Sequence, residues 1–281
     1  MTRAIQAAAC AAGLLLLALP GAAGAAEQTA SAESGTVRAD LRWDDEQPSQ
    51  FAPALRITRP GGAYDYAPSE CGGTPDKDLY CETPRVFEGH EFLIVRDIDG
   101  DGEPEVLVEM YSGGAHCCSI LRLYKWDGAA NTYASTKNNF ADVGFELRDV
   151  EGDGKVEFVS ADPRFAYAFA SFADSRFPIQ ILAFTDGDFD DVTARYPALI
   201  RADAREQWNA FREARRERRE VRGVLAAYLA DQFRLGRGAA ALRQVRRALR
   251  PLSRRDRRYL RSVRRYLKRW GYAGRADFRT V

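Results

Sequence analysis

The sequence contains few of the residues from which common catalytic and metal sites are built. It has 2 His and 5 Cys in 281 residues, whereas a structural zinc site usually takes four Cys or His ligands. It also lacks a Gly-x-Ser-x-Gly elbow, a phosphate-binding loop and a dinucleotide-binding fingerprint. No complete catalytic constellation can be assembled from what remains, so the sequence predicts a protein that is not an enzyme.

No long apolar run follows the N-terminal segment. Residues 1–25 combine Arg3, a leucine-rich stretch ended by Pro20, and the small residues Ala23-Gly24-Ala25, which is the pattern of a secretory signal peptide. The stretch is shorter than the roughly 20 apolar residues that span a bilayer. We therefore expect a cleaved signal peptide and a secreted or extracytoplasmic protein with no transmembrane segment after cleavage.

Four cysteines remain once the signal peptide is removed: Cys71, Cys81, Cys117 and Cys118. An even number suits disulfide formation in an oxidising compartment. The favoured pairing joins Cys71 to Cys81 and Cys117 to its neighbour Cys118. The alternative joins the Cys71–Cys81 loop to Cys117 and Cys118 by two cross-links. A redox-sensitive protein that uses Cys117 and Cys118 is a further hypothesis.

The net charge of +1 conceals two regions of opposite sign. Residues 1–200 carry 16 Lys/Arg and 32 Asp/Glu, a net of −16, and residues 201–281 carry 25 and 8, a net of +17. Residues 245–269 alone hold 12 Lys/Arg and one Asp. This basic region either binds an anionic cell-surface polymer or membrane surface, or docks on the acidic half of the chain. Because the protein is predicted to be exported, no nucleic-acid partner is expected.

Short β-branched and aromatic runs separated by turn residues predict an antiparallel β domain over residues 26–200. Strands are expected at 36–43, 54–58, 92–95, 106–111, 120–126, 145–148, 158–161 and 179–184. Apolar residues then recur at helical spacing, which predicts a basic region of three helices over 201–281. Gly236 and Gly271 are expected to end helices, and Ser253 with Asp256 to begin one.

An internal repeat is the most specific feature of the β domain. Residues 95–107 match residues 147–159 at an offset of 52, so two units are expected over about 92–140 and 145–195. Each unit contains an acidic loop with alternating carboxylates and two glycines. Ca²⁺ prefers about six to eight oxygen ligands, which such a loop can supply. An EF-hand is excluded, because its Glu at position 12 and flanking helices are absent.

The pattern Asp-x-Asp-Gly-Asp-Gly-x-x-Glu between two strands resembles the calcium-binding loop of FG-GAP/VCBS repeats, which form β-propeller blades. The resemblance implies one Ca²⁺ in each loop, bound less tightly in the second because Glu151 is longer than Asp. The implied ligands are side-chain oxygens, plus the carbonyls of Glu103 and Lys155: Asp97, Asp99, Asp101, Glu105, Asp149, Glu151, Asp153 and Glu157. Two units are fewer than the four to eight blades of a propeller, so an open or incomplete propeller-like array is expected.

These observations favour a secreted, non-catalytic, calcium-binding β module that acts in surface recognition or attachment. The alternative is an exported hydrolase in which calcium only supports the fold. Two further segments contain candidate site residues: His116 beside the cysteines, and Asp162 with Tyr167. The first is better explained as a turn fixed by a disulfide, and the second as part of the core.

Overall fold

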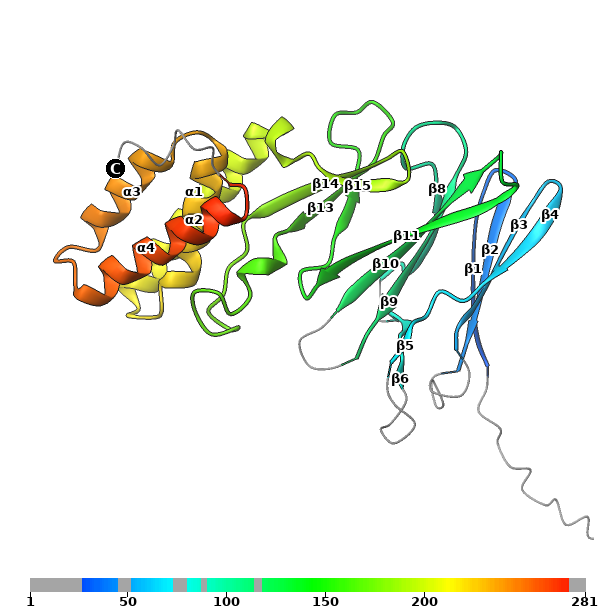
Figure 1. Cartoon of the computed structure of the whole chain (residues 1–281), viewed down its shortest axis with the longest axis horizontal. Helices are drawn as coiled ribbons and strands as arrows, with labels where there is room; N and C mark the ends of the chain where they lie inside the picture. The colour runs from blue at the N-terminus through cyan, green and yellow to red at the C-terminus, as the bar shows by residue number, and fades with distance from the viewer. Residues whose placement is uncertain (1–26, 45–51, 73–79, 87–89, 114–117, 273–281) are drawn as a thin grey trace, which may run out of the picture.

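The computed structural model describes residues 27–44, 52–72, 80–86, 90–113 and 118–272. They form antiparallel sheets followed by four α-helices (Figure 1), which confirms the predicted mainly β architecture with a helical C-terminal region. The predicted signal peptide, residues 1–25, lies outside the described residues, as do His116 and Cys117.

Three sheets make up most of the β part, and all of their strands are antiparallel. Sheet 1 is a meander of β1 (Gln28–Ser34), β2 (Val37–Trp43), β3 (Ala54–Arg59) and β4 (Gly62–Tyr66). Sheet 2 contains β7 (Thr83–Pro84), β8 (Leu93–Arg96), β9 (Glu105–Tyr111), β10 (Ser119–Asp127) and β11 (Thr132–Ala141). Sheet 3 contains β12 (Glu146–Arg148), β13 (Glu157–Ala161), β14 (Ile179–Thr185) and β15 (Asp188–Asp191). A small ladder pairs β5 (Cys71–Gly72) with β6 (Tyr80–Cys81).

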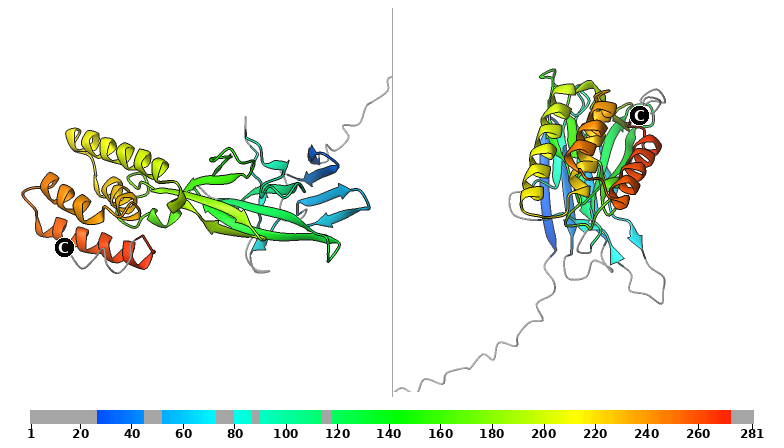
Figure 2. Two further views of the ribbon diagram at one scale, coloured as in Figure 1. Left: turned by 90° about the horizontal axis from the view of Figure 1, so that it is seen from above. Right: turned by 90° about the vertical axis from the view of Figure 1, so that its left-hand side faces the viewer.

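The layers follow one another along the long axis of the molecule, from sheet 1 at one end to the helices at the other (Figures 1 and 2). One apolar core lies between sheets 1 and 2, a second between sheets 2 and 3, and a third behind sheet 3. Strand β9 is buried on both faces: Val106 and Val108 belong to the first core and Leu107 to the second. Its apolar run from Val106 to Val108 therefore faces a core on both sides, as expected for a strand in a central sheet.

The first strand pair has the same register in the two repeat units. In the first unit Arg96 pairs with Glu105 across β8 and β9, and in the second Arg148 pairs with Glu157 across β12 and β13. Both partners are displaced by the offset of 52 residues. The described strands stack as open sheets and close into no barrel or propeller, so the predicted open or incomplete propeller-like array is not confirmed.

The helical region contains α1 (Pro197–Arg216), α2 (Arg222–Arg234), α3 (Gly238–Ala248) and α4 (Arg254–Arg269), preceded by the 3₁₀ turns η1 (Pro163–Phe165) and η2 (Thr193–Arg195). The prediction of three helices is wrong, because one expected helix is divided into α1 and α2. The division is at Arg218, whose φ is +58°. The Arg218 N–H donates to the Arg215 carbonyl, and the Arg219 N–H donates to the Ala214 carbonyl. This is the hydrogen-bond pattern of a Schellman motif, with arginine in place of the usual glycine.

Other helix ends follow the sequence signals. Ser253 and Asp256 form a reciprocal capping box at the start of α4. Gly236 and Gly271 have φ of +69° and +81° directly after α2 and α4. No helix in the described part of the chain is both long and apolar enough to cross a membrane.

Candidate metal centre

The two acidic loops of the repeat lie against each other where sheets 2 and 3 meet. The first connects β8 to β9 and the second connects β12 to β13. The Val156 N–H donates a hydrogen bond of 2.8 Å to the Ile98 carbonyl, and both side chains are buried in the core between the two sheets. The Lys155 side chain also lies close to Gly100, since a Cβ added there would be 3.0 Å from Lys155 Cγ.

Both loops make the same tight turn around the first aspartate. The Asp97 carboxylate accepts hydrogen bonds from the N–H groups of Gly100 (2.8 Å) and Gly102 (2.9 Å). Asp149 accepts the equivalent bonds from Gly152 (2.6 Å) and Gly154 (3.0 Å). All four glycines have positive φ, between +74° and +89°, a conformation that residues with a Cβ rarely adopt. The repeated glycines are therefore needed for the turn.

A buried glutamate closes each loop from the following strand. Glu105 Oε2 accepts a 2.8 Å bond from the Ile98 N–H, and Glu157 Oε2 accepts a 3.0 Å bond from the Val150 N–H. The remaining oxygens differ. Glu157 Oε1 accepts a bond from the Tyr196 hydroxyl at 2.9 Å, whereas Glu105 Oε1 lies 3.3 Å from the Lys125 ammonium group. Burial raises the pKa of Glu105 to about 7, and the charge of Asp99 adds to this effect.

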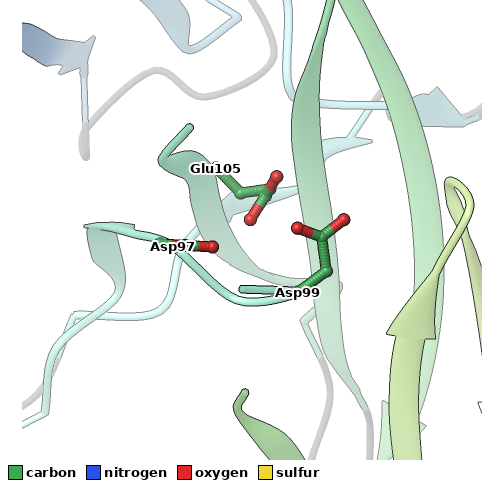
Figure 3. Close-up of side chains that lie close together, drawn as sticks. All are labelled: Asp97, Asp99 and Glu105. Atoms are coloured by element: carbon green, nitrogen blue, oxygen red, sulfur yellow. The ribbon is translucent and has the colours of Figure 1, made fainter. Parts of the chain in front are cut away.

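Three carboxylates of the first loop converge. Oxygens of Asp97, Asp99 and Glu105 all lie within 4.8 Å of one another (Figure 3). Asp101 is outside this cluster, and the Glu103 side chain forms an ion pair with Arg59 at 3.2 Å. Within the described residues no such cluster forms in the second loop, where Asp149, Glu151, Asp153 and Lys155 are exposed. The described structure thus brings three of the predicted ligands together in the first loop and forms no such cluster in the second.

Lys125 also belongs to the first site, although no motif in the sequence indicated it. Its Nζ lies 2.7 Å from Asp99 Oδ2, 2.5 Å from Asp101 Oδ2 and 3.3 Å from Glu105 Oε1. Burial alone would lower the pKa of Lys125, but hydrogen bonds to Asp101 and Asp99 outweigh it and raise the pKa above its usual value. Aligning residues 123–128 with 182–187 places Lys125 opposite Phe184. The sequence signal that could have identified Lys125 is that the second unit has no lysine at the matching position.

The donor set determines which ions the site can hold. Carboxylate oxygens on a tight loop suit hard cations such as Ca²⁺, and the absence of nitrogen and sulfur donors disfavours zinc and copper. The residues therefore fit the predicted Ca²⁺. They also fit an ammonium group, and Lys125 supplies one, so any bound cation competes with a side chain of the protein itself.

The other candidate sites do not assemble. Asp162 is fully buried, where it accepts bonds from Arg164 and from the Tyr272 hydroxyl at 2.7 Å, whereas Tyr167 is 62% exposed. Cys118 forms a disulfide, and Cys71 stands opposite Cys81 in the β5–β6 ladder. The side chains of Cys71 and Cys81 and all of Cys117 lie outside the described residues, so the predicted connectivity stays a prediction.

A second buried carboxylate, Glu109, was also not indicated by any motif in the sequence. Glu109 is 3% exposed and contacts His90 Nε2 at 2.6 Å and Arg85 Nε at 3.3 Å. The Ser119 hydroxyl donates to the same carboxylate. Because Ser119 donates to Glu109 and not to His90, the three residues do not form the nucleophile–base pair that a serine hydrolase requires.

The basic helices share an apolar core with Phe165, Phe169 and Phe177 of the β part. Within the described chain, one salt bridge joins the two regions: Arg234 Nη2 lies 2.8 Å from Asp191 Oδ2. Arg234 also donates to the Ile179 carbonyl at 2.8 Å. Helix α4 carries nine basic residues and one Asp. Among the described residues, opposite charges therefore contribute a single ion pair to this docking.

The model of the sll0997 C-terminal domain family matches residues 200–271, which span nearly all of the four helices. The chain is 32% identical over 148 residues, 51% of its length, to the probable thylakoid lumen protein sll0997 of Synechocystis. It is 30% identical over 138 residues, 48% of its length, to the uncharacterized protein y4bJ of Sinorhizobium fredii.

The chain covers 44% and 21% of these two relatives, less than half of either. A solved Xanthomonas structure, described as related to a type IV secretion system, aligns with 58% of this chain and 92% of its own. Its TM-score is 0.25 at 14% identity, which carries no argument about this protein.

The resemblance to FG-GAP/VCBS repeats is wrong. The family model that matches is the sll0997 C-terminal domain, and the described strands form no propeller. The resemblance rested on a loop of alternating carboxylates and glycines. Such a loop is a local turn whose hydrogen bonds lie within the loop and the next strand. Any antiparallel strand pair can present it, so it does not determine how sheets are arranged.

Proposed function

We propose that this chain is a non-catalytic, calcium-binding β module of an extracytoplasmic compartment, attached to an anionic surface by its basic helices. Calcium binding is proposed because carboxylate oxygens of Asp97, Asp99 and Glu105 all lie within 4.8 Å of one another. Three carboxylates at this separation repel one another strongly unless a cation lies between them. The proposal does not depend on a propeller fold.

The position of the loop supports a structural role for the ion. Glu105 is the first residue of β9 in the central sheet, and the loop is bonded to the second loop through Ile98 and Val156. A cation shared by Asp97, Asp99 and Glu105 would fix the start of β9 relative to the end of β8. Because the loop also contacts sheet 3, the ion would stabilise the joint between two layers.

Thermal unfolding in EDTA and in millimolar Ca²⁺ tests this part of the proposal. A ligand that binds only the folded state adds about 2.7 kcal/mol at a hundredfold excess over Kd. We expect a higher midpoint in Ca²⁺ and no comparable rise with the same ionic strength of NaCl. Equal midpoints in EDTA and Ca²⁺ would contradict the proposal and identify Lys125 as the permanent partner of the loop.

The extracytoplasmic location has two supports. Residues 1–25 have the pattern of a secretory signal peptide, and one similar protein is named as a probable thylakoid lumen protein. Fusing residues 1–25 to a reporter that is active only after export would test the location. An inactive reporter would contradict it.

Surface attachment is proposed for the helical region, because α4 presents exposed arginines such as Arg255, Arg258, Arg261 and Arg265. Attraction between basic helices and an anionic surface should weaken as salt shortens the screening length, which is about 8 Å at physiological ionic strength. Retention of the full chain on anionic vesicles should therefore fall with rising NaCl. Salt-independent retention, or none at low salt, would contradict attachment through charge.

A further inference from the structure

A cavity lined by arginines lies between α4, the start of α2 and the segment after η1. Its volume is about 570 Å³, within the range typical of small-molecule sites. Helix α4 contributes Arg255, Arg258, Arg261 and Arg265, and α2 contributes Arg222. The remaining lining residues are Ala168, Phe169, Tyr259 and Ser262.

The four arginines of α4 have no carboxylate partner within ion-pair distance in the described structure, and all four are exposed. They follow one another at spacings of three or four residues, so they lie on one side of the helix. Like charges at this spacing destabilise a helix. A bound anion would remove that repulsion.

The nearby acidic groups are already engaged. Glu220 forms an ion pair with Arg222 at 3.3 Å and accepts bonds from the N–H groups of Val221 and Arg222. Asp256 is held in the capping box with Ser253. The start of α2 is therefore capped by Glu220, and recognition of an anion in the cavity is left to guanidinium groups.

The base of the cavity is aromatic and fixed. Tyr259 is 7% exposed, and its hydroxyl donates to the Arg222 carbonyl at 2.7 Å. Phe169 packs edge-on against Tyr259, with ring centroids 6.3 Å apart. Guanidinium groups above an apolar base suit an oxyanion attached to an organic group, because their planar forks bind phosphate oxygens in pairs.

We propose that this cavity binds the phosphate group of a phosphate ester, as a soluble molecule or as the head group of an anionic lipid. The proposal rests on the attachment role of the basic helices and names the chemistry recognised there. It predicts that a few arginines around the cavity, and not the total charge of the helices, determine binding.

The test compares two double variants of the full chain that lose the same charge. Arg258→Gln with Arg261→Gln removes two cavity arginines. Arg243→Gln with Arg247→Gln removes two exposed arginines of α3 that do not line the cavity. Vesicles of phosphatidylcholine with phosphatidylglycerol are compared with phosphatidylcholine alone, and glycerol 3-phosphate is compared with glycerol. Circular dichroism melts establish that each variant is folded.

We expect the cavity variant to bind anionic vesicles about tenfold more weakly, since hydrogen bonds to charged groups contribute about a factor of ten or more. The α3 variant should lose less than about threefold. Equal losses in both variants would overturn the phosphate cavity and leave surface attachment standing. Binding of glycerol 3-phosphate that depends on Arg258 and Arg261, without vesicle binding, would support the cavity and overturn surface attachment. Binding of neither probe by the unaltered chain would overturn the cavity.

Discussion

The Lys125 ammonium group lies 2.7 Å from Asp99 Oδ2, in the middle of the carboxylates proposed to bind calcium. The Lys125 side chain is 22% exposed and that of Asp99 is 14% exposed, so the pair is only partly screened by solvent. Lys125 belongs to β10, whereas Asp99 belongs to the loop before β9. The lysine thus ties this loop to the neighbouring strand and opposes entry of a second cation.

Lys125→Met should raise the affinity for Ca²⁺ by about tenfold or more, because a competing positive charge next to the site is removed. The same change should lower stability in EDTA by about 1–3 kcal/mol, since the carboxylates lose their partner. Calcium titrations and melts measure both effects. Lys137→Met is the control, because Lys137 pairs with Glu70 and Glu82 away from the loops. A loss of stability that Ca²⁺ does not restore would contradict calcium binding.

Asp99→Ala should remove most of the stabilisation by Ca²⁺, and Glu151→Ala should leave it nearly unchanged. Asp99 belongs to the converging cluster, whereas Glu151 is exposed in the loop where no such cluster forms among the described residues. The measurement is the difference between the melting midpoints in Ca²⁺ and in EDTA, worth about 2.7 kcal/mol at a hundredfold excess. An equal reduction in both variants would place a second ion in the second loop.

Asp231 should make stability fall as pH rises above about 4. This residue of α2 is fully buried, and neither carboxylate oxygen has a hydrogen-bond donor in the described structure. Burial raises its pKa well above the usual range, and nearby Asp203 adds to the shift while Arg234 opposes it. Between the unfolded value of about 3.9 and the raised folded value, the folded state holds more protons. Stability is therefore lost across that window at up to about 1.4 kcal/mol per pH unit.

Asp231→Asn removes this titration and checks the sign. Urea unfolding of the variant should lose less stability than the unaltered chain between pH 4 and pH 7. Glu206→Gln, at an exposed position of α1, should follow the unaltered chain. A parallel pH profile for Asp231→Asn would show that Asp231 does not titrate in this window.

Arg218→Gly should stabilise the helical region by about 0.5–1 kcal/mol. Arg218 has φ of +58° at the end of α1, and a residue with a Cβ pays about 1–2 kcal/mol for this conformation. Glycine avoids that strain, although part of the gain is lost to greater freedom in the unfolded chain. Arg212→Gly, inside α1 at an exposed position, should instead cost about 1 kcal/mol. Urea unfolding measures both, and a same-sign effect would contradict the assignment of strain.

The strands that could be predicted are those with a buried face. In β2, Val37, Ala39 and Leu41 alternate with polar residues and are buried, so the period of two was visible. Strand β1 reads QTASAES, and its half-buried positions are Ala30, Ala32 and Ser34. These side chains are too small or too polar to give a visible apolar alternation, although Ala30 and Ala32 pack against the first core. The break between α1 and α2 could not be predicted, because the turn there is made by Arg218 and not by the glycine that usually marks the end of a helix.

The candidate site was predictable only as far as it is local. Asp97, Asp99 and Glu105 lie within nine residues, and their spacing predicted convergence. Lys125 arrives from β10, 26 residues after Asp99, and only the register of β9 with β10 brings it there. The arginine cavity likewise joins α4 to Arg222 and Phe169, positions that helical periodicity cannot relate. A local loop motif cannot predict the order in which sheets pack, and for this reason the resemblance to FG-GAP/VCBS repeats was misleading.

The serial order of layers determines how the two ends of the molecule can influence each other. Sheet 1 and the helices have separate cores with no described residue in common. Any free energy exchanged between them must pass through sheets 2 and 3, as in repeat proteins whose units contact only their neighbours. The Ile98–Val156 bond lies on that route. The acidic loops therefore occupy the point where mechanical load on one end would be transmitted to, or isolated from, the other.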